Sequence, residues 1–168
     1  METEIRRAGF SDSHEISKIY ALSWKTGYRG MIPQDYLDAL SEDYWTPKFQ
    51  KWLSEGTLRA LILSEDGVPS GAIAFGKSRE KELASWGEVV SLYLRPEVFR
   101  RGFGTLLMEE AFRFFRENGY RDCYLWVLRE NERAQAFYRS LGFRMTPDTV
   151  SYEIAGKQIV DCRYILHL

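Results

Sequence analysis

The stretch LYLRPEVFRRGFGTLLMEEAF, Leu92–Phe112, indicates where an apolar strand ends and an amphipathic helix begins. Between the two stand the adjacent Arg100 and Arg101, followed by Gly102 and Gly104. The first turn of a helix leaves amides unpaired, and the helix dipole makes that end partly positive, so a phosphate binds well there. Glycines let a phosphate approach the backbone, and arginines add charge-assisted hydrogen bonds. The stretch therefore predicts an anion-binding turn, with an ordinary tight turn and solvated arginines as the alternative.

The motifs of nucleotide-binding proteins are not expected to explain this turn. A dinucleotide-binding GxGxxG sequence requires a third glycine at the position of Leu107, and its strand–helix unit would stand early in a parallel sheet. Here the unit follows a predicted hairpin. We therefore expect neither a dinucleotide site nor a P-loop.

A second motif lies one strand downstream, in NERAQAFYRSLGF, Asn131–Phe143. Tyr138 follows Asn131 by seven residues, which is two turns of a helix and returns to the same face. The two side chains are therefore expected to line one wall together. The alternative is that Asn131 caps the helix while Tyr138 packs in the core beside Phe137.

Apolar periodicity and turn residues divide the rest of the chain into short elements. Helices are predicted over Ser11–Tyr28, with Asp12 and Glu15 at capping-box spacing, and over Met31–Leu40, Trp45–Glu55, Gly102–Asn118 and Asn131–Leu141. In the helix over Gly102–Asn118, the inward face is expected to hold Phe103, Leu106, Leu107, Ala111, Phe114 and Phe115. Strands are predicted over Glu4–Ala8, Leu58–Ser64, Gly71–Lys77, Gly87–Leu94, Cys123–Leu128, Asp148–Ile154 and Gln158–Leu166. This order predicts a mixed α/β domain with an antiparallel first half and one strand–helix–strand crossover between parallel strands.

Composition excludes several classes of protein. The chain has 168 residues, 45% of them hydrophobic, and a net charge of −1, which suits one domain without general affinity for nucleic acid or membranes. The N-terminus has no apolar signal core, so a cytoplasmic location is expected, with Cys123 and Cys162 as buried free thiols. Neither His14 nor His167 has a partner at metal-ligand spacing, so no metal is expected.

Together, the two motifs resemble the GNAT superfamily of acetyl-CoA-dependent N-acetyltransferases. That family has a strand, a proline and a glycine turn that opens a helix, followed one strand later by Asn and a Phe-Tyr or Leu-Tyr pair before Gly-Phe. The resemblance implies one GNAT domain over residues 1–168. Its fold is α/β (mixed α+β), with a central, mostly antiparallel sheet of about seven strands flanked by four or five helices. One position departs from the pattern: the family's usual Gln or Arg is Phe99 here.

The resemblance also implies how acetyl-CoA binds. The backbone of Leu92, Tyr93 and Leu94 would pair with the pantetheine arm like an added strand. Asn131 would contact the same arm, and Tyr138 would reach the sulfur. The pyrophosphate would be held by the turn of Arg100, Arg101, Gly102, Phe103, Gly104 and Thr105.

The implied reaction moves acetyl from acetyl-CoA directly to a primary amine. Tyr138 is expected to donate a proton or hydrogen bond to the leaving sulfur, because model phenol and thiol pKa values are about 10 and 8.5. Glu88, beside apolar neighbours on the central strand, is the candidate base, with a cross-strand surface charge as the alternative; Asp161 is the second candidate. Trp24 and Tyr28 are expected acceptor contacts, with a core anchor as the alternative for Trp24.

Two other functions share this scaffold. A GNAT-like domain without turnover would sense acyl-CoA, and an interaction protein would use the core only as a framework. The expected partners are acetyl-CoA and an amine acceptor, and the aromatic content is compatible with a homodimer. No motif identifies the acceptor.

Overall fold

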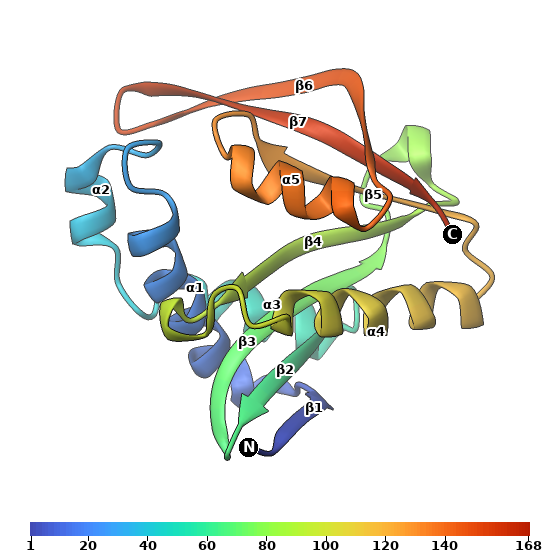
Figure 1. The fold of residues 1–168 in the computed structure, drawn as a ribbon, viewed down its shortest axis with the longest axis horizontal. Helices are drawn as coiled ribbons and strands as arrows, with labels where there is room; N and C mark the ends of the chain where they lie inside the picture. The colour runs from blue at the N-terminus through green and yellow to red at the C-terminus, as the bar shows by residue number, and fades with distance from the viewer.

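The computed structural model describes residues 1–168, and its strands form a single seven-stranded sheet (Figure 1). The strand order is β1-β2-β3-β4-β5-β7-β6, and all neighbours are antiparallel except β4 and β5, which are parallel. The strands are β1 (Thr3–Arg7), β2 (Arg59–Glu65), β3 (Val68–Lys77), β4 (Gly87–Leu94), β5 (Asp122–Leu128), β6 (Arg144–Ile154) and β7 (Lys157–His167). The mixed, mostly antiparallel α/β sheet and its single parallel crossover are thus confirmed.

Five α-helices accompany the sheet: α1 (Ser13–Gly27), α2 (Gln34–Ala39), α3 (Thr46–Glu55), α4 (Phe103–Glu117) and α5 (Glu132–Ser140). Three short 3-10 helices lie at Phe10–Asp12, Lys81–Leu83 and Pro96–Val98. Gly56, in the left-handed conformation, ends α3 as its position in the sequence predicts. No helix combines the length and apolar character that crossing a membrane requires.

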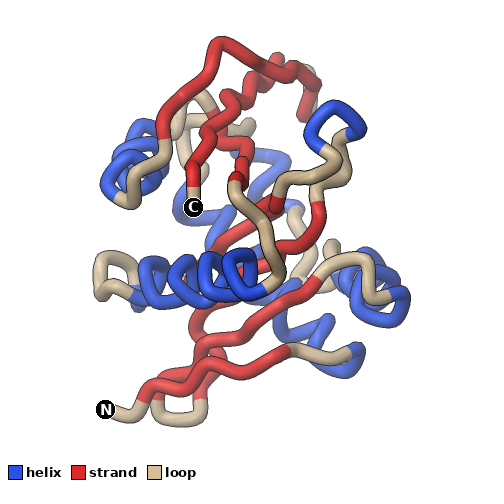
Figure 2. Tube along the Cα trace, turned by 90° about the vertical axis from the view of Figure 1, so that its right-hand side faces the viewer, coloured by secondary structure: helices blue, strands red, loops and turns tan.

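Helices cover both faces of the sheet, with strands between them in Figure 2. The alternation of side chains along β3 assigns each face. Ala72 and Ala74 pack in one cluster with residues of α1 and α3, while Ile73 and Phe75 pack in the other with residues of α4. The small alanines let α1 approach the sheet closely, and the larger residues fill the space under α4.

The sheet opens between β4 and β5. These strands pair only at Gly87 with Cys123 and at Glu88 with Tyr124, and then diverge (Figure 1). On its other edge, β4 carries a bulge opposite β3, where Val90 is the extra residue between two regular pairs. A bulge bends its strand and increases its twist, so it favours this divergence. The result is a wedge between the two halves of the sheet.

Two local predictions were wrong. Asp12 does not form a capping box with Glu15; its carboxylate accepts the Gly9 amide at 2.8 Å and pairs with Arg6 at 2.8 Å. In α4, Leu106 is 39% exposed and not inward. The buried face of α4 consists of Phe103, Gly104, Leu107, Met108, Ala111, Phe112 and Phe115.

The stretch GAIAFGKS, Gly71–Ser78, has the glycine, lysine and serine spacing of a P-loop. In the structure, Gly71–Lys77 is part of β3 and pairs with β2 and β4, so its amides belong to the sheet ladder. A P-loop needs those amides free in a turn before a helix. The sequence therefore does contain the P-loop spacing, contrary to the expectation above, and it is the strand conformation of these residues that excludes a P-loop.

Close packing at Gly87, at the narrow end of the wedge, leads to a prediction about stability. A Cβ at Gly87 would lie 2.6 Å from the Phe115 ring, which is fully buried. We expect Gly87→Ala to lower the free energy of unfolding by about 1–3 kcal/mol, because the core must shift to relieve this contact. Urea unfolding measures the change. Gly9→Ala is the control, since a Cβ there meets no atom within 4 Å; equal stability of the two variants would contradict the close packing.

Candidate active site

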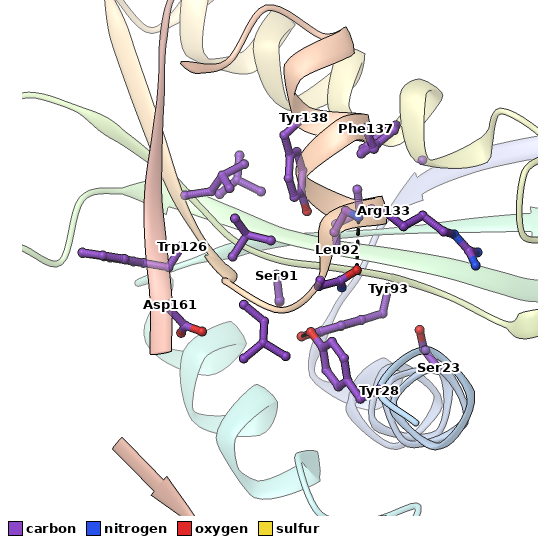
Figure 3. Close-up of a pocket in the computed structure, with 18 of the residues that line it drawn as sticks. Ser23, Tyr28, Ser91, Leu92, Tyr93, Trp126, Arg133, Phe137, Tyr138 and Asp161 are labelled. Atoms are coloured by element: carbon purple, nitrogen blue, oxygen red, sulfur yellow. Dashed lines mark hydrogen bonds between the residues drawn. The ribbon is translucent and has the colours of Figure 1, made fainter. Parts of the chain in front are cut away.

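A cavity of about 700 Å³ occupies the wedge between β4 and β5. Its walls come from the end of α1, the turn before α4, the first turns of α5 and the β6–β7 hairpin, in addition to the two strands (Figure 3). Most residues predicted for the site line this one cavity: Trp24, Tyr28, Glu88, Leu92, Tyr93, Leu94, Arg100, Gly102, Gly104, Thr105, Asn131 and Tyr138. The structure therefore brings together segments far apart in the sequence.

The inner edge of β4 offers free backbone groups to this cavity. Pairing with β5 stops at Glu88, so the edge of Ser91–Leu94 that faces the wedge has no strand partner. The opposite edge of the same residues pairs with β3. An unpaired edge inside a protein is a template for an extended ligand, which adds to the sheet as a further strand.

The turn before α4 has the features of an anion site. Gly102 is the N-cap of α4 with φ of 83°, and no side chain caps the helix, so its first amides remain available. Arg100 also has a positive φ, 63°, which is uncommon for a residue with a side chain and is often retained at functional sites. The Arg100 side chain is exposed and has no acidic partner.

Two predicted cofactor residues do not bring their side chains to the cavity. The Arg101 guanidinium lies 2.6 Å from the Glu65 carboxylate, and the Phe103 ring is buried in the core. Only their backbone amides remain near the turn. The pairing of Arg101 with Glu65 spans 36 positions, and no local pattern in the sequence announces it.

Gly104 has a second role besides opening the turn. A Cβ at this position would lie 3.2 Å from the Phe137 ring, so glycine lets α4 and α5 approach each other. The Cβ position of Gly102 has open space within 4 Å. A bulky residue at position 104 would therefore disturb helix packing as well as ligand approach.

Asn131 and Tyr138 share one wall, as their spacing predicts. Asn131 is also the N-cap of α5, because its Oδ1 accepts the Ala134 amide at 3.1 Å. The Tyr138 ring packs against Phe137 and Phe143, but its hydroxyl has no hydrogen-bond partner in the protein and points into the cavity (Figure 3). Burial raises the pKa of Tyr138, so the hydroxyl stays protonated at neutral pH.

Aromatic residues form the side of the cavity next to α1. The Tyr28 and Tyr93 hydroxyls lie 3.0 Å apart, and burial raises the pKa of both. Trp24 packs edge-on against Tyr28 at 4.8 Å and tilted against Trp45 at 5.1 Å. Its indole nitrogen is buried without a hydrogen-bond partner. Trp24 is thus a core anchor that also leaves one donor unused at the cavity wall.

Asp161 on β7 supplies a carboxylate at one end of the cavity (Figure 3). The Tyr152 hydroxyl donates to it at 3.2 Å, and no basic side chain pairs with it. Burial raises the pKa of Asp161 above the ordinary carboxyl value, which makes this group a stronger base. Arg133 extends from α5 at the opposite end of the view, so the two ends of the cavity carry opposite charge.

The Glu88 carboxylate is buried and fully engaged in hydrogen bonds. Glu88 is 3% exposed, and its carboxylate accepts Arg79 Nη2 at 2.7 Å, Arg79 Nε at 3.1 Å and the Tyr124 hydroxyl at 3.0 Å. This bidentate pair raises the pKa of Arg79. Glu88 is the last residue of β4 that pairs with β5. Its hydrogen bonds therefore hold the two strands together at the narrow end of the wedge. Arg79 lies in a loop without a motif, so no pattern in the sequence indicates this partner.

Comparisons with known proteins agree with this geometry. Residues 16–143 match the acetyltransferase (GNAT) family. The chain is 29% identical to the uncharacterized N-acetyltransferase YuaI of Bacillus subtilis, over 92% of this chain and 87% of that protein. It is 28% identical to a spermidine N(1)-acetyltransferase of Thermoplasma acidophilum, over 86% of this chain and 90% of that protein.

Solved structures share the fold. The PaiA N-acetyltransferase of Thermoplasma acidophilum, in complex with coenzyme A, superposes with a TM-score of 0.82 at 23% identity, over 100% of both chains. YncA of Salmonella typhimurium, solved with acetyl-CoA, has a TM-score of 0.74 at 20% identity, over 99% of this chain and 94% of that chain. The family match, with the wedge, the turn and the tyrosine in place, leads to one conclusion: this chain belongs to the acetyltransferase (GNAT) family and is an N-acetyltransferase.

Proposed function

We propose that this enzyme transfers acetyl from acetyl-CoA directly to a cationic primary amine. The observation that carries the proposal is the arrangement along the cavity: an anion-binding turn at one end, a free strand edge, the unpartnered Tyr138 hydroxyl and then Asp161 at the other end. The coenzyme A and acetyl-CoA in two structural relatives support the choice of acyl donor.

The residues present fit acetyl-CoA as the donor. The turn from Arg100 to Thr105 offers helix amides and a free guanidinium to the diphosphate. The free edge of Ser91–Leu94 pairs with the amide groups of the pantetheine arm. A β4 amide then donates to the thioester oxygen and stabilises the negative charge that develops there during attack.

Proton transfer completes the reaction. The acceptor ammonium first passes one proton to Asp161, because only the neutral amine has a lone pair for attack. The nitrogen then forms the C–N bond, the C–S bond breaks, and the second proton of the nitrogen passes to solvent. Tyr138 donates a hydrogen bond to the departing sulfur and supplies its proton, and solvent then restores the Tyr138 proton. The raised pKa of Tyr138 keeps the phenol neutral, so it can donate a hydrogen bond to the sulfur as negative charge develops there.

Asp161 is preferred over Glu88 as the base. Glu88 already accepts four hydrogen bonds, three from Arg79 and one from Tyr124, and these occupy its oxygens. Asp161 has one neutral partner and faces the cavity. A carboxylate without a cation also attracts an ammonium group, so Asp161 both binds the acceptor and receives its proton. Glu88 remains the second candidate.

The residues around Asp161 also indicate the chemical class of the acceptor. Tyr28 and Tyr152 present aromatic groups near the Asp161 carboxylate, a combination that favours a cationic ligand. The relative that is a spermidine N(1)-acetyltransferase makes polyamines the first acceptors to test. Turnover with any amine separates this proposal from an acyl-CoA sensor without turnover. A cytoplasmic location and a homodimer stay predictions.

Cofactor binding yields the first test of this function. Acetyl-CoA should stabilise the folded chain by about 2.7 kcal/mol at a hundredfold excess over its dissociation constant, measured by thermal unfolding. Arg100→Gln should weaken binding roughly tenfold, because one charge-assisted bond to phosphate is lost. Arg101→Gln is the matched control and should bind normally, since its guanidinium holds Glu65. Equal losses in both variants would contradict the assignment of the turn.

Tyr138→Phe removes only the unpartnered hydroxyl and keeps the packed ring. We expect the turnover number to fall roughly 10²-fold, while the affinity for acetyl-CoA and the melting temperature stay near those of the wild type. Steady-state kinetics, calorimetric titration and thermal unfolding measure the three quantities. A variant with wild-type turnover would remove Tyr138 from the mechanism, and water would then protonate the sulfur.

Asp161→Asn and Glu88→Gln separate the two candidate bases. The raised pKa of Asp161 means that its ionised form disfavours the folded state, and this penalty sets in as pH rises through the unfolded-state pKa. Asp161→Asn should therefore keep or increase stability at pH 7 while turnover falls by roughly 10² or more. Its pH–rate profile should lose the acidic limb.

Glu88→Gln should behave in the opposite way. It breaks the bidentate pair with Arg79, so unfolding free energy should drop by about 1–3 kcal/mol, toward the lower value because Arg79 is half exposed. Turnover should change less than in Asp161→Asn. A loss of turnover confined to Glu88→Gln, at unchanged stability, would instead make Glu88 the base.

A further inference from the structure

The end of the cavity next to the α4 turn has fewer free arginine side chains than the sequence of the turn suggests. Arg101 is held by Glu65, and position 99 carries an apolar ring. Two guanidinium groups remain at this end, those of Arg100 and Arg133, and neither has an acidic partner. Both residues are exposed and line the cavity together with Phe99 and Gly102.

Phe99 and Arg133 are in contact with each other. The central carbon of the Arg133 guanidinium lies 5.2 Å from the centre of the Phe99 ring, within the range of a cation–π interaction. Phe99 is partly buried, and Arg133 stands in the first turn of α5, two residues after the N-cap Asn131. The ring therefore restrains a flexible side chain whose N–H groups remain free for a ligand.

Other arginines stacked on aromatic rings show what distinguishes this pair. Three of them also hold carboxylates: Arg79 with Glu88, Arg101 with Glu65 and Arg163 with Glu80. Two others, Arg59 over Phe114 and Arg116 over Phe112, hold no carboxylate but do not line the cavity. Arg133 alone combines a stacked guanidinium, no anionic partner and a place at the cavity wall.

We propose that Arg133, positioned by the Phe99 ring, binds a phosphate of acetyl-CoA and so supplies from α5 a charge that the turn lacks at position 99. A guanidinium held over a ring face keeps its N–H groups free, and they can donate to two phosphate oxygens at once. Phe99 is then a positioning residue that acts through Arg133. This inference rests on the proposed acetyl-CoA function, which the test below separates from it.

The test is calorimetric titration of the full chain with three donors: acetyl-CoA, acetyl-dephospho-CoA and S-acetylpantetheine, which has no phosphate. Arg133→Gln should raise the dissociation constant of acetyl-CoA roughly tenfold and leave that of S-acetylpantetheine unchanged. In kinetics, KM for acetyl-CoA should rise while kcat at saturation stays the same. Phe99→Leu should raise the acetyl-CoA constant about two- to fivefold, because the restraint is lost but the charge remains.

Two controls make the outcome specific. Arg116→Gln removes another exposed, ring-stacked arginine, on the far end of α4, and should change nothing. The double variant Phe99→Leu/Arg133→Gln should bind no more weakly than Arg133→Gln, since Phe99 acts only through Arg133. Additive losses would overturn the positioning role.

The acetyl-dephospho-CoA arm identifies the phosphate. A loss that disappears with this donor assigns Arg133 to the 3′-phosphate, and a loss that persists assigns it to the diphosphate; both outcomes support a phosphate contact. An Arg133→Gln variant within twofold of the wild type for acetyl-CoA would overturn the inference while leaving the proposed function intact. A wild-type chain that binds no acetyl-CoA at all would overturn the proposed function itself.

Discussion

The parallel pairing of β4 with β5 ends after two residue pairs, and the rest of the site depends on that early end. A sheet that stayed closed would have used the inner edge of Ser91–Leu94 for its own hydrogen bonds. Instead, the bulge at Val90 bends β4 away, and the Glu88 carboxylate, held by Arg79 and Tyr124, fastens the point where the strands part. The open edge is an unpaired strand edge inside the protein, next to α1, α5 and the β6–β7 hairpin.

The two ends of the cavity that this opening creates carry opposite charge. The end at the α4 turn has uncapped helix amides and free guanidinium groups, whereas the β7 end has the single carboxylate of Asp161. Between them lie tyrosines whose pKa values burial raises, so they stay neutral donors. Under the proposed function, an anionic donor and a cationic acceptor would be drawn to opposite ends and would meet beside Tyr138, without any side chain having to change its charge on binding.

Local features of the sequence predicted most of the fold. The bounds of β4 and the glycine that ends α3 follow from nearest neighbours, and the shared wall of Asn131 and Tyr138 follows from helical spacing. The sequence did not predict contacts that depend on a distant partner. The guanidinium of Arg101 is drawn to Glu65 on β2, and Gly104 makes room for Phe137, which belongs to another helix.

The surroundings of Glu88 and Asp161 were also not predictable from the local sequence. The pairing of Glu88 with Arg79 joins a strand to a loop that has no motif, and the exposure of Asp161 to the cavity depends on how the β6–β7 hairpin meets the wedge. Composition and periodicity identify neither. Whether a carboxylate is paired with a cation or free depends on contacts between distant elements. A single sequence does not reveal those contacts.

Hydrogen–deuterium exchange with and without acetyl-CoA tests whether the open edge of β4 receives the donor as an added strand. We expect slower exchange at backbone amides in Ser91–Leu94 and in residues 100–105 when acetyl-CoA is bound, because new hydrogen bonds protect them. The edge strand β1, over Thr3–Arg7, does not line the cavity and should exchange at the same rate in both states. Unchanged exchange along β4 in a chain that binds acetyl-CoA would contradict the account and place the donor elsewhere.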